Sequence, residues 1–527
     1  MEFLNEIKRR RTFGIISHPD AGKTTLTEKL LLFGGAIQEA GAVKSNKIKK
    51  SATSDFMEIE RQRGISVATS VLAFIYRDKK INILDTPGHK DFAEDTFRTL
   101  TAVDSVIVVI DVAKGVEEQT EKLVEVCRMR NIPTIIFINK LDREGKDAFD
   151  LLDEIEQKLD LKVTPLSLPI GMGYDFKGIF NIWEQNIQLF SDEQKQTIGK
   201  KLTFNSISDS KLEKAIGSAH LELLKEELEL IEVVYPKFNK EAYLEGKLNP
   251  VLFGSALNNF GIEELLNCFI EIAPEPLPKV SEERMVNPDE KKFSGFVFKI
   301  HANMDPNHRD RLAFVKIVSG TFERNTPYLH VRQNKKLKFS SPNTFFAEKK
   351  EIVDVSFPGD IVGLHDTGNF KIGDTLTSGE KIKFKGIPSF SPEHFRYINN
   401  KDPMKSKQLS KGIDQLMDEG VAQLFILNLN GRKLIGTVGA LQFDVIQYRL
   451  LHEYGAQCSY ENINVYKACW IEGDEKSSSF KDFKRVKQKF LAYDKKGQLV
   501  FLSDSSFSLQ MTQDKFKDLQ FHFTSEF

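Results

Sequence analysis

The octapeptide Ser17-His18-Pro19-Asp20-Ala21-Gly22-Lys23-Thr24 stands between an apolar stretch, Phe13–Ile16, and an amphipathic one, Lys23–Leu32. The first stretch has the pattern of a buried strand and the second that of a helix. Small residues let backbone N–H groups curl around a phosphate, while Lys23 can bridge its outer oxygens and Thr24 can hold Mg²⁺. Taken alone, the segment is also compatible with an ordinary strand–turn–helix, because Ser17 stands where such loops usually begin with Gly.

Two further motifs each follow a predicted strand. Asp85-Thr86-Pro87-Gly88-His89 comes after Ile81–Leu84, so that Asp85 can hold a metal through water and the Gly88 N–H can face a γ-phosphate. Asn139-Lys140-Leu141-Asp142 comes after Thr134–Ile138. The Asp142 carboxylate can accept from guanine N1–H and the exocyclic amine, a donor pair that adenine lacks. Each motif alone is compatible with a plain turn or a polar loop.

The order of the motifs decides between these interpretations. Gly254-Ser255-Ala256-Leu257 follows the strand Val251–Phe253 and offers backbone amides to the guanine oxygen. Ligands of open α/β sheets bind at the carboxyl ends of the strands, which is where all of these motifs fall. The sequence therefore predicts a GTPase. The predicted GTP/GDP contacts are Ser17, His18, Pro19, Asp20, Ala21, Gly22, Lys23, Thr24, Thr25, Asp85, Thr86, Pro87, Gly88, Asn139, Lys140, Leu141, Asp142, Ser255, Ala256 and Leu257. The predicted Mg²⁺ ligands are Thr24, Asp85 and Ser66, the last from the charged loop Asp55–Ser66.

The predicted fold class is an α/β P-loop GTPase domain with an insertion, then a β-barrel domain and a C-terminal α+β domain of split βαβ type. The GTP-binding domain is expected over residues 1–276, with the insertion over about 161–249 and an unbroken charged helix, Leu212–Val233, inside it. Further strands are expected at Val67–Tyr76 and Val106–Ile110, and helices at Phe92–Thr101, Glu117–Met129, Lys146–Leu159 and Ile262–Ile272.

The proline-rich segment Pro274–Pro278 predicts a linker, because proline cannot continue a helix. Short alternating segments over 285–386 predict the β-barrel. In 387–527, helices Lys407–Met417 and Ala440–Leu451 flank strands Leu424–Asn428 and Ile435–Val438, and only further short strands are expected after Gly455. No internal repeat is apparent in the sequence, and this last region has room for roughly one typical domain.

The composition is that of a globular chain, with 40% hydrophobic and 28% charged residues and a net charge of −1. There is no apolar run of membrane-spanning length and no signal-peptide pattern at Met1–Arg11. Four scattered cysteines without a CxxC pair argue against structural zinc and disulfides. We therefore expect a cytoplasmic location and neither a membrane nor a DNA partner. Basic clusters at 44–50, 335–338 and 481–489 could contact RNA phosphates, although solvated surface is the alternative.

The motifs Arg61-Gln62-Arg63-Gly64-Ile65-Ser66, Asp85–His89, Asn139–Asp142 and Gly254–Leu257 together resemble those of the ribosome-dependent translational GTPases. The resemblance covers the whole chain and implies ribosome-stimulated hydrolysis of GTP to GDP and phosphate. It implies that His89 is catalytic and positions the attacking water, with Pro19 and Ile65 screening that water beforehand. Without the resemblance, an isolated His after a Gly turn is more often a surface or structural residue. Ser66 stands where the family has Thr and keeps the metal-binding hydroxyl.

Within this group the three-domain layout, the opening 15–24 and Arg63-Gly64-Ile65-Ser66 are similar to the peptide chain release factor 3 family. That similarity implies a role in translation termination: promoting dissociation and recycling of stop-codon-reading (class I) release factors after peptide release. The implied partners are the ribosome and class I release factors, and the expected state is a monomer. The alternatives are a truncated elongation or ribosome-rescue GTPase, or a non-catalytic GTP-sensing scaffold.

Overall fold

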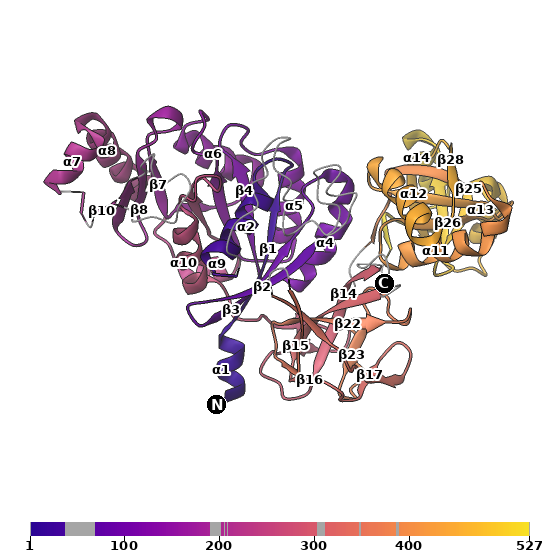
Figure 1. The fold of residues 1–527 in the computed structure, drawn as a ribbon. Coiled ribbons are helices and arrows are strands. Elements are labelled where there is room, and N and C mark those ends of the chain that lie inside the picture. Colours follow the sequence, from indigo (N-terminus) through magenta and orange to yellow (C-terminus); the bar gives the residue numbers. More distant parts are fainter. Residues whose placement is uncertain are drawn as a thin grey trace.

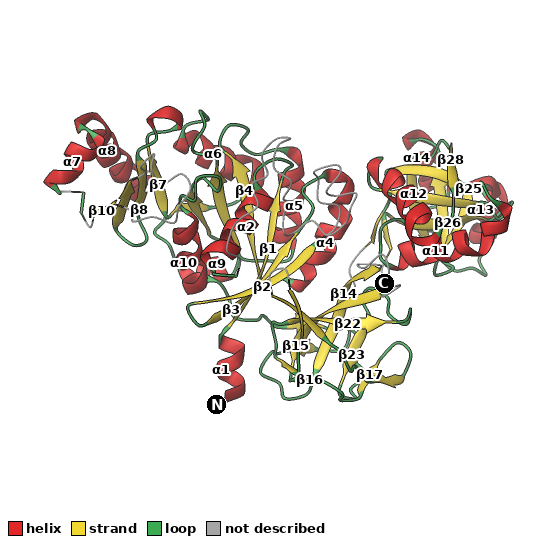
Figure 2. Ribbon diagram, viewed as in Figure 1, coloured by secondary structure: helices red, strands yellow, loops and turns green. Residues whose placement is uncertain are grey.

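The structure is a computed structural model and describes residues 2–36, 69–189, 202–204, 206–207, 209–302, 311–346, 349–385 and 389–525. The loop Asp55–Ser66, and with it the predicted metal ligand Ser66 and the screening residue Ile65, lies outside the described residues. The basic cluster at 44–50 also falls outside them. Figures 1 and 2 show a helix-covered sheet, a β-rich part below it and a separate α+β part that contains the C-terminus.

The first part is a mainly parallel sheet in the order β2-β3-β1-β4-β5-β11-β6. Its strands are β1 (Arg10–Ser17), β2 (Ser70–Tyr76), β3 (Lys79–Asp85), β4 (Ser105–Asp111), β5 (Thr134–Asn139), β6 (Val163–Pro165) and β11 (Asn249–Phe253). Its helices are α1 (Glu2–Lys8), α2 (Lys23–Phe33), the short η1 (Lys90–Phe92), α4 (Ala93–Ala102), α5 (Glu118–Met129), α6 (Ala148–Leu159) and α10 (Ile262–Ile272). Of these seven described strands, β2 alone runs antiparallel to its neighbour, β3. The predicted α/β fold is confirmed, and its predicted elements agree with these bounds to within a few residues.

Both faces of this sheet are buried against helices. Successive strand residues point to opposite sides, so each strand contributes to both faces. In β4, Ile107 and Val109 face a cluster that includes Leu30 of α2 and Leu265 of α10. Val106, Val108 and Ile110 face a second cluster with α4, α5 and α6. These near-continuous apolar runs are what a sheet covered by helices on both sides requires. The arrangement leaves the carboxyl ends of the strands as the edge where polar residues gather.

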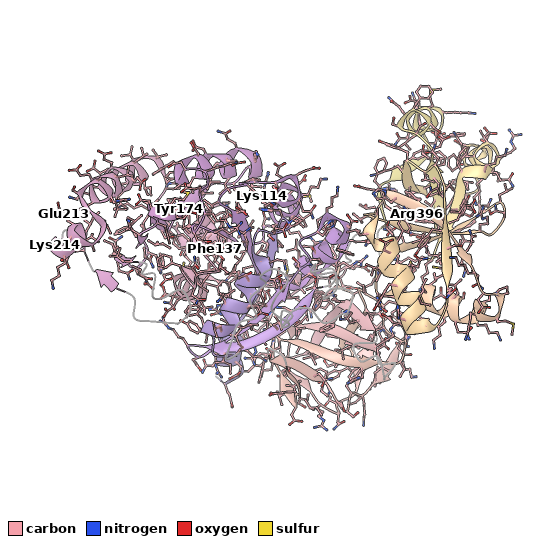
Figure 3. The ribbon with its side chains drawn as sticks, turned by 45° about the horizontal axis from the view of Figure 1, so that its top comes forward. Lys114, Phe137, Tyr174, Glu213, Lys214 and Arg396 are labelled. Carbon is pink, nitrogen blue, oxygen red and sulfur yellow. The ribbon has the colours of Figure 1, made fainter. Side chains whose placement is uncertain are left out.

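The expected insertion 161–249 begins and ends with main-sheet strands, since β6 pairs with β11 through Val163 and Asn249. Between them lie a small antiparallel sheet, three described α-helices and the short 3-10 helix η2 (Gly173–Asp175). These elements are β7 (Ser167–Ile170), β8 (Gly178–Asn181), β9 (Asn186–Leu189), β10 (Leu202–Phe204), α7 (Ser210–Ile216), α8 (Ser218–Val234) and α9 (Lys240–Leu244). The expectation of one unbroken helix over Leu212–Val233 is wrong: Gly217, at φ +87°, ends α7 and starts α8. Glycine adopts this conformation freely, and its place inside the charged run was the missed signal. Figure 3 shows Glu213 and Lys214 at the tip of this part, with Arg396 of the C-terminal part at the other end of the molecule.

The β-barrel part consists of antiparallel strands around an aromatic core that includes Phe293, Phe322, Tyr328 and Phe370. Its strands are β14 (Ser294–Ala302), β15 (Arg311–Ser319), β16 (Phe322–Glu323), β17 (Tyr328–His330), β18 (Lys335–Leu337), β19 (Asn343–Phe346), β20 (Lys349–Ile352), β21 (Val355–Ser356), β22 (Ile361–Asp366) and β23 (Thr375–Thr377). The hairpin β12 (Lys279–Val280) and β13 (Met285–Val286) leads into it. β19 also pairs in parallel with β2, which joins the barrel strands to the first sheet.

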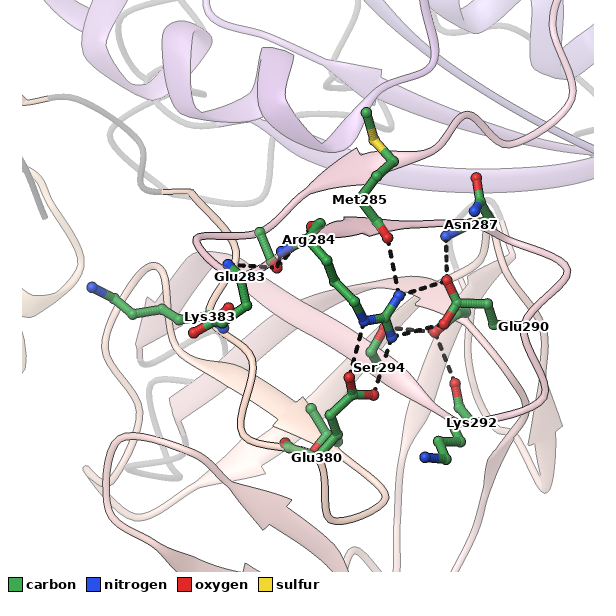
Figure 4. A network of polar contacts seen from close by, with 12 residues as sticks. Glu283, Arg284, Met285, Asn287, Glu290, Lys292, Ser294, Glu380 and Lys383 are labelled. Atoms are coloured by element: carbon green, nitrogen blue, oxygen red, sulfur yellow. Dashed lines mark hydrogen bonds and ion pairs between the residues drawn. The ribbon is translucent and has the colours of Figure 1, made fainter.

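An arginine fastens the entry hairpin onto the barrel. Arg284 donates to both carboxylate oxygens of Glu290 at 2.8 Å, and to the Glu380 oxygens at 2.9 and 3.1 Å. It also donates to the carbonyl of Met285 at 3.0 Å. Figure 4 shows the guanidinium between these two carboxylates. Bidentate contacts of this kind fix geometry as well as charge, so the chain enters the barrel along one defined path.

The C-terminal part is larger than the single split βαβ unit that the sequence predicts. Its elements are β24 (Ser389–Phe390), β25 (His394–Asn400), α11 (Ser406–Asp418), β26 (Gln423–Leu427), β27 (Lys433–Thr437), α12 (Leu441–Tyr454), β28 (Cys458–Asn462), β29 (Lys467–Glu472), α13 (Ser478–Val486), β30 (Leu491–Asp494), β31 (Leu499–Ser503), α14 (Ser506–Lys515), β32 (Gln520–His522) and β33 (Thr524–Ser525). The expectation of strands alone after Gly455 is wrong, because α13 and α14 lie there.

These elements form two split βαβ units in tandem. The sheet order is β28-β25-β27-β26-β30-β31-β29-β32. Counted outwards from the central β26–β30 pair, each half has the second, third, first and fourth strand of its own unit. The faces that the helices leave free share one apolar cluster containing Phe425, Trp470 and Val500. The structure therefore contains a repeat that is not visible in the sequence, because the two units share the order of their elements and not their residues.

No helix in the described part of the chain is both long and apolar enough to span a bilayer. All four cysteines, Cys127, Cys268, Cys458 and Cys469, are buried and free.

Candidate active site

The predicted phosphate loop occupies the turn from β1 to α2. β1 ends at Ser17 and α2 begins at Lys23, with Thr24 and Thr25 in its half-buried first turn. Gly22 has φ +95°, and a Cβ added there would lie 2.4 Å from Nδ2 of Asn139. No side chain fits in that space. The backbone of the loop can therefore approach a bound anion closely only because residue 22 is glycine.

Asn139 brings the phosphate loop and the two base-reading segments together. Its Nδ2 donates to the carbonyl of Ala21 at 2.8 Å, and its Oδ1 accepts from the backbone N–H of Ala256 at 2.9 Å. The hydroxyl of Ser255 donates to Oδ1 of Asp142 at 2.5 Å. Three segments that are distant in sequence thus meet at the carboxyl edge of β1, β5 and β11. The predicted roles of Asn139 and Asp142 need this convergence.

The Lys140 side chain spans the same edge. Its own backbone and that of its contact Asp20 are both in the left-handed region. Its Nζ donates to Oδ2 of Asp111 at 2.7 Å and to the carbonyl of Asp20. Asp20 and Lys140 both have positive φ, 65° and 72°. Burial raises the pKa of the Asp111 carboxyl, but hydrogen bonds from Lys140 and from the Ala113 N–H hold it below its ordinary value. Non-glycine residues in this conformation concentrate at functional sites.

Asp111 is a site residue that sequence reasoning missed. It ends β4, and the available signal was its place at the same carboxyl edge as Ser17, Asp85 and Asn139. No motif marked it, because its partner Lys140 comes from the next strand along the chain.

The pair of Lys23 and Asp85 lies at the centre of the candidate metal site. Lys23 Nζ contacts Oδ1 of Asp85, and both side chains are buried. The other carboxylate oxygen, Oδ2 of Asp85, is buried and has no hydrogen-bond partner among the residues that the structure describes. An orphaned buried carboxylate oxygen is costly unless a ligand, ion or water satisfies it. The residues present therefore fit a nucleotide with a hydrated Mg²⁺.

No cluster of three or more acidic, histidine or cysteine side chains that could hold a metal was found in the described part of the chain.

His18 adds a buried imidazole to the phosphate loop. Its side chain is fully buried and lies 3.7 Å from a Glu117 carboxylate oxygen. Within the described ranges, neither ring nitrogen has a hydrogen-bond partner. Burial lowers the pKa of His18 below its ordinary value, more than Glu117 raises it. The ring is therefore neutral near pH 7.

The segment that contains His89 lies beside the phosphate loop. A Cβ added at Gly88 would be 3.5 Å from the His18 carbonyl oxygen and 3.7 Å from Cα of Pro19. Thr86 donates to the carbonyl of Ile15 at 2.7 Å, which fixes the start of the segment. The His89 side chain is 29% exposed, and its Nδ1 accepts from the backbone N–H of Asp91 at 3.2 Å. His89 thus caps η1 and directly follows Gly88, which lies against the loop.

Three family models match successive parts of the chain. The elongation factor Tu GTP binding domain matches residues 8–275, elongation factor G domain 2 matches residues 292–379, and the class II release factor RF3 C-terminal domain matches residues 384–513. Among solved structures, a crystal structure of a protein from Thermus thermophilus has a TM-score of 0.70 at 21% identity, over 89% of this chain and 71% of that chain. This second likeness shows a shared fold.

The first match spans more than half of the 527 residues, and the other two follow it in order. The chain therefore belongs to the family defined by the elongation factor Tu GTP-binding domain and is a release-factor-3-like translational GTPase, which binds guanine nucleotide, hydrolyses GTP and interacts with the ribosome.

Proposed function

We propose that this GTPase promotes the dissociation and recycling of class I release factors from the ribosome after peptide release. The observation that carries the proposal is the match of residues 384–513 to the C-terminal domain of a class II release factor, joined to a GTPase domain in one chain. Four buried, free cysteines suit the reducing cytoplasm in which this work would take place. We expect the protein to act as a monomer.

In this proposal the nucleotide lies along the carboxyl edge of the sheet. The phosphates rest on residues 17–25, with the N-terminus of α2 adding positive potential. The guanine is held by Asp142 and the backbone of 255–257. Asn139 and Lys140 act by fixing these loops, as their hydrogen bonds to Ala21, Ala256 and Asp111 support. Mg²⁺ would be held by Thr24, Ser66 and, through water, Asp85, and would neutralise charge that develops on the phosphates.

Lys23 and Asp85 would change partners when the nucleotide binds. Their buried contact supports this, because a phosphate within reach offers the ammonium more negative charge than one carboxylate does. The Asp85 carboxylate would then be free for the hydrated metal. His89 would orient the attacking water from the neighbouring segment, and Pro19 would line its approach. Catalysis of this kind is mainly positioning and charge stabilisation.

The test is multiple-turnover peptide release from ribosomes stalled at a stop codon, with a class I release factor limiting. Faster turnover that needs GTP, and that is lost in His89→Ala, is the expected result. Asp142→Asn should weaken the preference for guanine, because its amide no longer accepts from both donors. No change in release despite ribosome-stimulated GTP hydrolysis would move the function to another step of translation.

A further inference from the structure

The GTPase domain contacts the C-terminal domain at the ends of two neighbouring helices, α11 and α12. The backbone N–H of Leu441, the first residue of α12, donates to Oδ2 of Asp91 at 2.7 Å. Arg98 of α4 donates to the carbonyl of Gly420, just after α11, at 2.6 Å. Phe92, between these two contacts, packs on Val445 with Leu441 and Tyr448 beside it. We call these contacts the helix-end dock.

The charges of the dock match the two helix ends. The first turn of a helix has unpaired N–H groups and positive potential, and the last turn has unpaired carbonyls and negative potential. A carboxylate, Asp91, meets the N-terminus of α12, and a guanidinium, Arg98, meets the C-terminal end of α11. Both charged side chains are buried. The dock is therefore specific for one orientation of the C-terminal domain.

Two glycines make the close approach possible. A Cβ added at Gly439 would lie 1.9 Å from Cγ of Asp91, and one added at Gly420 would lie 1.8 Å from Nη1 of Arg98. The turn that presents Gly439 is itself fixed, since Oε1 of Gln442 accepts from the N–H groups of Val438 and Gly439 at 2.8 and 3.2 Å. The C-terminal domain thus offers a preformed seat for the Asp91 carboxylate.

The same carboxylate faces the candidate catalytic histidine. Nδ1 of His89 lies 3.3 Å from Oδ1 of Asp91: it accepts from the Asp91 backbone N–H when it is unprotonated and can donate to Oδ1 when it carries the proton, while Oδ2 is held by Leu441. One buried side chain therefore contacts α12 with one oxygen and the imidazole with the other. A partner at one ring nitrogen of a histidine sets which way the ring points and which nitrogen is left for chemistry.

We propose that Asp91 is a positioning residue for His89, and that the C-terminal domain, when docked through α12, holds Asp91 in the orientation that His89 needs. This inference rests on the role proposed above for His89. When α12 leaves, Asp91 loses the donor that fixes its carboxylate, and the imidazole loses its fixed neighbour. The position of the C-terminal domain is thereby transmitted to GTP hydrolysis through a single side chain.

The experiment compares Asp91→Ala and Gly439→Ala with the wild type in ribosome-stimulated GTP hydrolysis at saturating ribosomes. Gly439→Ala changes only the C-terminal domain and places a methyl group where the carboxylate lies. Both variants should lower kcat by roughly 10- to 100-fold, as loss of a partner that orients a histidine does. The dissociation constant for a fluorescent guanine nucleotide should stay unchanged. Asp91→Asn, whose amide oxygen can still accept from Leu441, should recover part of the loss.

Neighbouring exposed residues provide matched controls. Lys90→Ala and Ala440→Ser flank the two test positions and should keep the wild-type kcat. The double variant Asp91→Ala/Gly439→Ala should be no slower than Asp91→Ala alone, because both changes remove the same link. Melting of each variant, followed by Trp470 fluorescence in a Trp183→Phe background, reports whether the C-terminal domain stays folded.

Three outcomes would overturn the inference: a wild-type kcat in Asp91→Ala, additive losses in the double variant, or a loss in Gly439→Ala that only parallels unfolding at Trp470. A higher kcat would also contradict it, since the dock would then be inhibitory. His89→Ala separates this inference from the proposed function. If His89→Ala is slow and Asp91→Ala is not, only the inference fails, whereas wild-type turnover in His89→Ala removes the proposed role of His89 itself.

Discussion

The GTPase domain is joined to its two neighbours in different ways. Towards the barrel it shares an apolar core that includes Val103 of the first domain and Phe314 of the second, crossed by buried ion pairs. Lys316 donates to Asp104 at 2.8 Å and to Thr12 at 3.0 Å, and Asp360 of the barrel lies between Arg10 and Lys80. Towards the C-terminal domain, the described residues of the GTPase domain offer the much smaller helix-end dock.

This difference indicates which part of the molecule can move. A buried, charge-paired interface with a continuous core opens only at a high cost, because each charge would be left without its partner. The helix-end dock consists of two hydrogen bonds and one apolar contact, all formed by η1 and α4, which directly follow the predicted γ-phosphate sensor Asp85–His89. The GTPase domain is thus joined more firmly to the barrel than to the C-terminal domain. Its contacts with the C-terminal domain come from η1 and α4, the elements next to the predicted γ-phosphate sensor.

The largest expected effect is that of Lys316→Ala, which leaves Asp104 buried without its closest cation. The free energy of unfolding of the GTPase–barrel body should fall by about 3–5 kcal/mol. Urea unfolding followed by Trp183, in a Trp470→Phe background, measures it, because Trp183 donates to Glu271 of α10. The exposed pair of Lys122 and Glu118 is the control, and Lys122→Ala should leave the midpoint unchanged. If Lys316→Ala shifted the urea midpoint reported by Trp470 equally, the barrel interface and the helix-end dock would not differ in the way described.

A smaller effect is expected from acid. Burial raises the pKa of the Asp360 carboxyl, but Lys80 and Arg10 outweigh it and hold the pKa at about 2, against 3.8 in the unfolded chain. Because the folded pKa is depressed, the stability that Asp360 contributes is complete above about pH 4 and is lost as the pH falls towards 2. The contribution is about 2 kcal/mol. Asp360→Asn should flatten the acid dependence of the Trp183 transition and leave that of Trp470 unaltered; equal acid dependence in both proteins would contradict this.

The smallest effect is expected at the dock. Arg98→Lys keeps a cation beside Glu94 but loses the reach of the guanidinium to the Gly420 carbonyl. The loss is about 1 kcal/mol of docking free energy. The radius of gyration from small-angle X-ray scattering should rise while the Trp183 transition stays in place. A fall in GTPase-domain stability without any change in shape would mean that Arg98 serves its own domain and not the dock.

Much of the fold and of the candidate site follows from local pattern. Apolar strands with polar residues at their carboxyl ends predicted β1, β3, β4, β5 and β11, and the motifs placed Gly22, Lys23, Asp85 and Asn139 at one edge. The missed features share one cause. Asp111 and Asp91 belong to none of the motifs, and their partners Lys140 and Leu441 are 29 and 350 residues away. Gly217 was present in the sequence, but a charged helical run masked its effect.

The second split βαβ unit was missed for a related reason. Helices α13 and α14 are short, and their apolar residues, such as Phe483 and Leu509, are few. Only the pairing of β26 with β30 shows that the two units share one sheet. A backbone repeat needs the same order of elements and the same burial pattern but not the same residues. It can therefore exist without sequence similarity between the two units.

By itself the sequence determined that this chain is a P-loop GTPase, and it predicted which residues line the nucleotide edge. Phosphate binding and guanine recognition each depend on a few residues at fixed spacing, and spacing is local. Only the tertiary structure decided how that switch is connected: a rigid joint to the barrel through buried charges, and an oriented dock to the C-terminal domain through the ends of α11 and α12. Those contacts depend on which distant atoms fold to within about 3 Å of one another, a distance that only the packed chain determines.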